Sequence, residues 1–117
     1  MTIIRTNIEN LSEDKKTLYK LTKSKGIAVK DAEGVFKVNA FLIYEDVNAK
    51  GEIQTVTAVL CEDGEGNSVK LQSISATFRR EFEEIVDIMG DDEFSIILIH
   101  GTTKNGRDFV SCEMFCD

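Results

Sequence analysis

The feature that most constrains the fold is a long alternation of side chains between Val35 and Glu45, in a chain that has no proline. Apolar residues recur there at every second position, which is the period of a β-strand. The same period resumes over residues 52–61 and over residues 68–72, each time after a turn-forming stretch that contains glycine and asparagine. The pattern therefore predicts three consecutive antiparallel strands joined as hairpins.

After Ser75 the period changes to that of a helix. Five apolar residues fall on one face of this helix, which Gly90 can end; they are Phe78, Phe82, Ile85, Val86 and Met89. Two further strands are expected at residues 94–100 and 108–115. The dipeptide Asn105-Gly106 between them is typical of a type I′ hairpin turn.

Three strands, a helix and two strands are the element order of the five-stranded oligonucleotide/oligosaccharide-binding barrel, the OB-fold. We therefore expect a mainly β protein with its helix between strands three and four. A chain of 117 residues has the size of one domain. The barrel is expected over residues 35–115, and residues 1–30 are expected to form an N-terminal arm or a short helix capped by Ser12.

Composition and cysteine usage argue against several classes of protein. No apolar run is long enough to cross a bilayer and the N-terminus lacks a secretory pattern, so a cytoplasmic protein is expected. The three cysteines are expected to be reduced, and with His100 they lack the spacing of a zinc site. Neither a metal nor another cofactor is predicted. No nucleophile and base have a spacing that specifies an active site, so a protein without enzymatic activity is expected.

Charge is strongly segregated along the chain, although its net value is −7. Residues 1–40 carry eight basic and five acidic side chains, whereas residues 41–100 carry four basic and thirteen acidic ones. Six lysines occur over residues 15–30 without an intervening acid, and residues 81–93 hold seven acids without a base. These runs are expected to form either two solvated faces or the two sides of an electrostatically polarised molecule.

The outer face of the predicted barrel mixes cations, small polar groups and two aromatic rings. If residues in phase with Val38 and Leu42 fill the barrel, the intervening residues point outward; these include Lys37, Asn39, Phe41, Lys70, Gln72, Arg107 and Phe109. Cations can follow phosphates while rings stack on bases, so this face suits a single-stranded nucleic acid. The alternative is that the N-terminal segment covers Phe41 and Phe109 as a small second core, through Leu18, Tyr19 or Leu21.

Four short segments carry a resemblance to a known group of proteins. They are Leu18-Tyr19-Lys20-Leu21-Thr22, Tyr44-Glu45-Asp46-Val47-Asn48, Ser73-x-Ser75-x-Thr77-Phe78 and Gly101-x-x-Lys104-x-Gly106-Arg107-x-Phe109-Val110. In their order and turn chemistry they resemble the small single-stranded DNA-binding proteins of bacteriophages that infect Gram-positive bacteria. The resemblance implies a replication accessory that coats transient single strands, protects them from nucleases, removes secondary structure and has no catalysis of its own. By position, Lys104, Arg107 and Phe109 are its best matches in the last hairpin.

We therefore expect a single-stranded DNA-binding protein of phage DNA replication, located in the host cytoplasm if the chain is phage-encoded. Single-stranded DNA is its expected partner, and no membrane partner is expected. The candidate DNA-binding residues are Lys23, Lys25, Lys37, Asn39, Phe41, Tyr44, Lys70, Gln72, Lys104, Arg107 and Phe109.

The acidic helix supports two further expectations. It is a candidate docking surface for basic replication proteins. Alternatively, the whole protein could act as a DNA mimic that occupies the basic cleft of a host enzyme, with acids in place of phosphates; these are Glu81, Glu84, Asp87, Asp91 and Asp92. On the same helix, Arg79 and Arg80 are expected to pair with Glu83 and Glu84, four residues further along.

Overall fold

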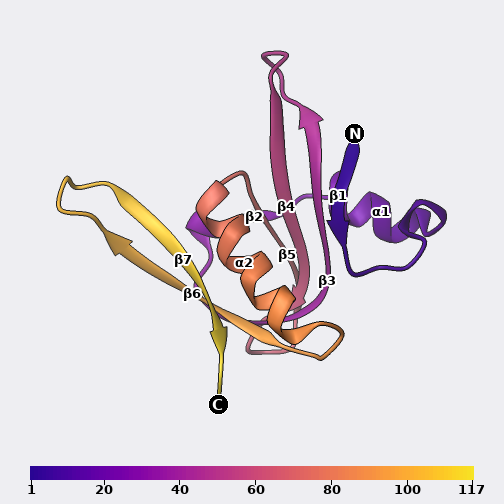
Figure 1. The fold of residues 1–117 in the computed structure, drawn as a ribbon. Coiled ribbons are helices and arrows are strands. Elements are labelled where there is room, and N and C mark those ends of the chain that lie inside the picture. The colour runs from indigo at the N-terminus through magenta and orange to yellow at the C-terminus, as the bar shows by residue number, and fades with distance from the viewer.

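The structure is a computed structural model that describes residues 1–117. Figure 1 shows its helices and strands arranged around a strongly curved sheet. In chain order the elements are β1 (Thr2–Thr6), η1 (Leu11–Glu13), α1 (Lys15–Thr22), β2 (Ile27–Ala28), η2 (Val29–Asp31), β3 (Gly34–Val47), β4 (Ile53–Glu62), β5 (Ser68–Ser73), α2 (Ala76–Met89), β6 (Ser95–Thr102) and β7 (Asp108–Phe115). The prediction of a mainly β protein is thus confirmed.

All seven strands belong to one sheet in the order β2-β5-β4-β3-β6-β7, with β1 added beside β3. β3 is the central strand, because it pairs with β4 along most of its length and shares its other edge between two partners. On that edge β6 pairs with residues 34–37, and β1 pairs with residues 42–45. The β3–β4 and β6–β7 hairpins leave the body of the molecule in different directions, upward and to the left in Figure 1.

The sheet does not close into the predicted five-stranded barrel. A barrel has no free edges, but here no ladder joins β5 to β7. Residues 27–33, which we call the strap, run between them. On one side, β2 of the strap pairs in parallel with Leu71 and Gln72 of β5. On the other, the Nε2 atom of His100 lies 2.5 Å from the carbonyl oxygen of Ala32 in the strap. The architecture is therefore a curled, open sheet, to which residues 1–30 contribute two strands.

A one-residue bulge reverses the predicted orientation of the second half of β3. The register with β4 shifts between Val38 and Ala40, so Asn39 is an extra residue on β3. Because side chains alternate with a period of two, an inserted residue exchanges the two faces of the strand beyond it. Phe41 and Ile43 consequently lie in the main core. The prediction had placed Ala40 and Leu42 there instead.

Side chains of the N-terminal segment form the hydrogen bonds that the bulge leaves open. Residues 38–41 lie between the parts of β3 that pair with β6 and with β1. Asn7 Nδ2 donates to the carbonyl oxygen of Asn39 at 3.3 Å, and Asn7 Oδ1 accepts from the amide of Phe41 at 2.9 Å. Thr6 Oγ1 donates to the carbonyl oxygen of Phe41 at 2.7 Å. These two side chains therefore satisfy main-chain groups that a neighbouring strand satisfies elsewhere.

Different parts of the chain cover the two faces of the sheet. The main core brings α2 against β3, where the rings of Phe41 and Phe82 meet edge to face with centroids 5.2 Å apart. A smaller core lies under α1 and comprises Leu11, Leu21, Leu42, Tyr44 and Ala58. The N-terminal segment thus builds a second core, as the alternative prediction stated, but that core covers Leu42 and Tyr44 and leaves Phe41 to α2.

Side chains cap both α-helices. The side chain of Ser75 accepts a main-chain hydrogen bond at 3.2 Å at the start of α2, and Gly90 ends this helix, as predicted. α1 is capped by Asp14, so the prediction of Ser12 was wrong. In the β6–β7 turn only Gly106 has a positive φ, whereas a type I′ turn needs two such residues, so the predicted turn type was also wrong. Neither helix is long and apolar enough to cross a membrane.

The three cysteines are free thiols in two kinds of environment. Cys61 and Cys112 are buried, whereas Cys116 is exposed. Burial is the main cause that raises the pKa of Cys61 and of Cys112 to about 12. Because the thiolate is the reactive form of cysteine, we expect these two side chains to react slowly in the folded protein.

Replacing Phe41 by alanine should lower the free energy of unfolding by about 3–5 kcal/mol, because a buried ring is removed from the main core. Replacing Phe109, which is 44% exposed, should lower it by less than about 1 kcal/mol. Urea unfolding followed by circular dichroism measures both changes. Equal losses in the two variants would contradict the placement of Phe41 in the core.

One thiol per folded chain should react quickly with a chromogenic disulfide reagent, since only Cys116 is exposed. All three should react once the protein is unfolded in denaturant. Cys116→Ser should remove the fast phase and leave the slow one. Fast reaction of this variant in the absence of denaturant would show that Cys61 or Cys112 is accessible.

Candidate nucleic-acid interface

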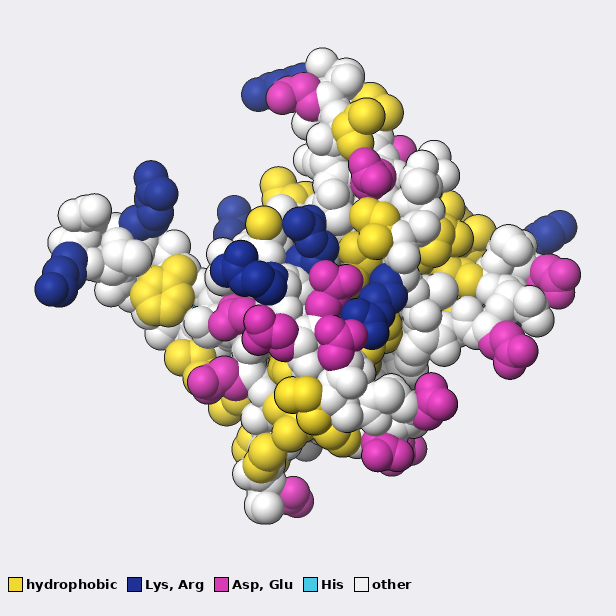
Figure 2. All heavy atoms as spheres, in the orientation of Figure 1, with side chains coloured by type: hydrophobic (Ala, Val, Ile, Leu, Met, Phe, Trp, Pro, Cys, Tyr) yellow, Lys and Arg dark blue, Asp and Glu magenta, His cyan; other side chains and the backbone are white.

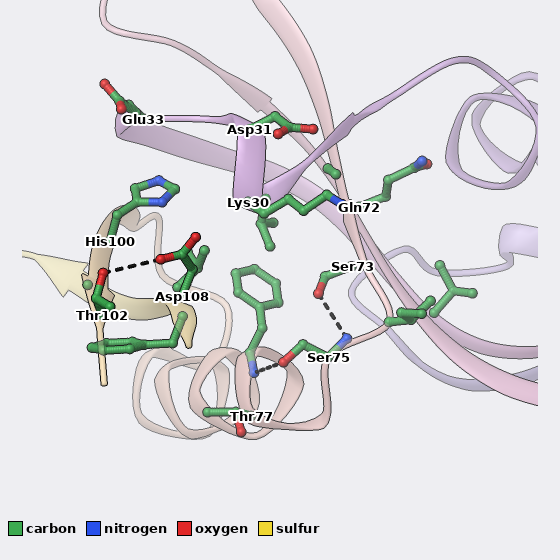
Figure 3. A pocket seen from close by; sticks show the side chains of 18 residues that line it. Lys30, Asp31, Glu33, Gln72, Ser73, Ser75, Thr77, His100, Thr102 and Asp108 are labelled. Atoms are coloured by element: carbon green, nitrogen blue, oxygen red, sulfur yellow. Dashed lines mark hydrogen bonds between the residues drawn. The ribbon is translucent and has the colours of Figure 1, made fainter. Parts of the chain in front are cut away.

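A wide cleft of about 1250 Å³ lies along the line where the sheet stays open, and we call it the seam cleft. Five parts of the chain line it: the strap, Val56 of β4, residues 72–75 at the end of β5, the first turn of α2, and the β6–β7 hairpin. Figure 3 shows these side chains facing the cleft from its different sides. Two of the predicted DNA-binding residues, Gln72 and Phe109, meet here.

Phe109 offers an aromatic surface at the seam cleft because its ring lies across Gly101. The two residues are directly opposite in the β6–β7 ladder. A β-carbon at position 101 would lie 2.8 Å from Cε1 of Phe109 and would overlap the tip of the ring. Glycine therefore lets the ring rest against the neighbouring strand. Since Phe109 remains 44% exposed, much of its surface is available for contact with a ligand.

The charged side chains that line the seam cleft are mostly acidic. One lysine, Lys30, lines the cleft, together with three acids: Asp31, Glu33 and Asp108. Figure 3 shows Lys30 reaching toward Gln72, while Glu33 points away from the cleft. Attraction of phosphates is therefore weak within the cleft itself, and stacking and apolar contact are what it offers most.

Two sources of positive potential adjoin the seam cleft. The first turn of α2 reaches it with Ser75 and Thr77, and the N-terminus of a helix carries a partial positive charge. The turn between β6 and β7 carries Lys104 and Arg107, which are exposed and form no ion pair. Figure 2 shows dark-blue side chains at the tip of this hairpin, away from the acids that gather over α2.

A second hollow, of about 570 Å³, gathers lysines from distant parts of the chain, and we call it the lysine hollow. Lys20 of α1, Lys25 of the following loop and Lys70 of β5 line it together with Asn39, the bulge residue. The acid that lines it is Asp14. Three of the predicted residues, Lys25, Asn39 and Lys70, are thus brought together, but at a place separate from Phe109.

Lys70 is unusual because it is only 8% exposed, so its prediction as an exposed outer-face residue was wrong. The loop after α1 covers it, and Lys70 Nζ donates to the carbonyl oxygen of Ser24 at 2.7 Å. No carboxylate pairs with it. Burial lowers the pKa of the Lys70 ammonium group. An ammonium group has three donors, so donors remain for a ligand in the hollow.

Other predicted residues do not join either surface. Phe41 and Tyr44 are buried, so their prediction as stacking residues was wrong: the bulge turns the first inward, and the N-terminal segment covers the second. Lys37 is exposed, but its Nζ lies 3.7 Å from a carboxylate oxygen of Glu93. Lys23 is exposed at the end of α1 and lines neither concave surface. The continuous outer face that was predicted is therefore divided among the seam cleft, the β6–β7 turn and the lysine hollow.

Three contributors were missed in the sequence: Gly101, Lys30 and Lys20. A signal for Gly101 exists, because counting outward from the turn pairs it with Phe109, and a glycine opposite an aromatic residue is a sign of this packing. No local sequence pattern indicates that Lys20 and Lys30 lie at these surfaces. They reach their surfaces only because α1 packs on β4 and the strap pairs with β5.

The acidic surface of α2 is partly neutralised by the N-terminal strand. Arg5 of β1 lies 2.6 Å from a carboxylate oxygen of Asp87 and 3.9 Å from one of Glu83. The predicted pairs within the helix are not formed; their members were Arg79, Arg80, Glu83 and Glu84. Acids and bases therefore lie side by side over α2, as Figure 2 shows.

Comparison with known proteins found no family model, no curated protein and no solved structure that matches this chain. The chain also has no group of three or more histidine, cysteine, aspartate or glutamate side chains placed to hold a metal ion. The seam cleft and the lysine hollow are therefore its candidate binding surfaces.

Gly101→Ala should displace the ring of Phe109 without unfolding the protein, because alanine fits a strand but its methyl group overlaps the ring. In the wild-type protein, the ring current of Phe109 should shift the α-proton resonances of Gly101 upfield, and Phe109→Leu should remove this shift. Ser111→Ala, on the same strand but opposite Ile99, is the control and should leave the shift unchanged. An ordinary Gly101 shift in the wild type would mean that the ring does not lie there.

Proposed function

We propose that the protein binds single-stranded DNA, with bases stacked on Phe109 at the seam cleft. The observation that carries the proposal is the exposed ring, held across Gly101 on the wall of a wide, open cleft. An aromatic ring can stack on any base and contributes about 1–3 kcal/mol per base. A duplex keeps its bases within the stack, so an exposed ring of this kind favours an unpaired strand.

The strand arrangement supports the proposal by analogy of fold. We interpret β3 to β7 as the five strands of an OB barrel that remains open between its third and fifth strands, with α2 between the third and the fourth. OB-folds bind oligonucleotides with the loop between strands four and five among their contacts. In this chain that loop is the β6–β7 turn with Lys104 and Arg107. Fold analogy alone does not assign a function, so the exposed ring is the stronger support.

The proposed role is to coat and protect transient single strands during phage DNA replication, as the resemblance of the four segments implies. Lys104 and Arg107 would contact phosphates beside the base that stacks on Phe109. Because the seam cleft has three acids and one lysine, we expect few phosphate contacts inside it. Affinity in the cleft then depends mainly on stacking.

Phe109→Ala should weaken binding of a fluorescein-labelled oligothymidylate by about 1–3 kcal/mol, as expected for the loss of one stacking ring. Fluorescence anisotropy at low salt measures the dissociation constant. Phe115→Ala is the matched control, because Phe115 is also on β7 and 40% exposed but does not line the seam cleft. It should bind as the wild type does.

Two results would reject this function. One is the absence of any binding of single-stranded oligonucleotides by the wild-type protein at low salt. The other is an equal loss of affinity in the Phe109 and Phe115 variants, which would mean that no particular ring is involved. A duplex of the same sequence should compete poorly with the single strand.

The alternative function, a DNA mimic, has less support. Of the five acids proposed as phosphate substitutes, Asp87 is paired with Arg5, and Glu81 accepts a hydrogen bond from the amide of Cys112 at 3.3 Å. The other three are exposed: Glu84, Asp91 and Asp92. Docking of basic replication proteins on this face needs fewer free acids than a DNA mimic does. It stays a prediction.

A further inference from the structure

The lysine hollow has a marked excess of positive charge. Lys20, Lys25 and Lys70 line it, and none of the three forms an ion pair. Its acid, Asp14, already uses Oδ1 to accept the amide hydrogen bond that caps α1. A concave surface with three ammonium groups and one carboxylate concentrates positive potential and attracts anions.

Lys70 adds an argument that exposed lysines do not. It is only 8% exposed, and its ammonium group has a single carbonyl partner instead of a carboxylate. Burying a charge without an opposite charge costs free energy. An anion in the hollow would provide that charge, so the hollow is better matched to an occupied than to an empty state.

The lysine hollow and the seam cleft are neighbours along β5. Gln72 lines the cleft and Lys70 lines the hollow, and residues two apart on a strand point to the same side. Gly26 lies against both of them: a β-carbon built there would be 3.0 Å from Gln72 Oε1 and 3.1 Å from Lys70 Cδ. Gly26, which has no side chain, therefore lies where the two concave surfaces adjoin.

We propose that the lysine hollow is a phosphate-binding subsite, which holds the sugar–phosphate backbone of the single strand whose bases stack on Phe109. This inference rests on the proposed function, because it assumes that the seam cleft holds bases. The lysine hollow would supply the phosphate contacts that the acidic lining of the seam cleft lacks. Base contacts and phosphate contacts are then divided between two adjacent surfaces that Gly26 connects.

Two double variants with the same net charge test the subsite. Lys20→Gln/Lys25→Gln removes two ammonium groups from the hollow, and Lys15→Gln/Lys16→Gln removes two from the same segment outside it. None of the four side chains is buried, so both variants should fold. The dissociation constant of a long oligothymidylate is measured for each across a salt series. In the first variant only, the slope of log affinity against log salt should fall in magnitude by about 0.7 for each phosphate that is no longer neutralised.

The outcomes separate this inference from the proposed function. Equal changes in the two double variants would show a general effect of charge and would overturn the subsite. If Phe109→Ala loses affinity while Lys20→Gln/Lys25→Gln keeps the wild-type slope, the subsite is overturned and the proposed function stands. If the wild type binds no oligonucleotide, the proposed function fails first.

Inorganic pyrophosphate probes the hollow without DNA. In amide NMR spectra it should shift the resonances of Ser24, Lys25 and Gly26 in a saturable way, and those of the β6–β7 turn should change little. Lys20→Gln/Lys25→Gln should abolish these shifts. Absent shifts, or small ones spread over all lysines, would overturn a phosphate site. Saturable shifts together with an unchanged salt slope for oligonucleotides would indicate a site for free phosphate and would overturn the assignment to the strand backbone.

Discussion

The bulge at Asn39 sets which residues of the central strand face each core, and Asn7 supplies hydrogen bonds at this position. They satisfy the Asn39 carbonyl and the Phe41 amide at the point where β3 changes partner from β6 to β1. With the bulge in place, one strand gives Phe41 to the core under α2 and Leu42 to the core under α1. The bulge also places Asn39 at the lysine hollow. The bulge, at which a side chain of the N-terminal segment bonds the main chain, thus determines which residues of the central strand enter each core.

Much of the fold could be predicted because its signals are local. The change of period after Ser75 and the glycine at position 90 define α2, and alternation with intervening turns defines the hairpins. The bulge could not be predicted, since residues 40–44 are all apolar and either phase of the alternation fills a core. The side chains that bond the main chain at the bulge, Asn7 and Thr6, are more than thirty residues away in the chain. The bulge explains why Phe41 was assigned to the wrong surface, and Tyr44 was assigned wrongly because the N-terminal segment covers it.

The candidate site shows the same division between local and long-range information. Phe109 was correctly placed outward, because it belongs to a hairpin whose register its own turn fixes. Lys25, Asn39 and Lys70 were expected on a surface shared with Phe109, but they meet at a second surface, which forms only when the loop after α1 folds against β5. The type of a residue and its phase in a strand indicate whether it can take part in binding. Which other residues lie beside it depends on contacts between distant segments.

The strap takes the place of the ladder that would close a barrel between β5 and β7. In a closed barrel the strand number and the shear fix the circumference, and no change of diameter is possible without breaking a ladder. Here the perimeter is completed by a two-residue parallel pairing and one imidazole contact. The strap also buries Val29 and Ala32 in the main core, so apolar side chains fill the gap between β5 and β7. The gap that a barrel closes with a main-chain ladder is thus closed here largely by side-chain packing.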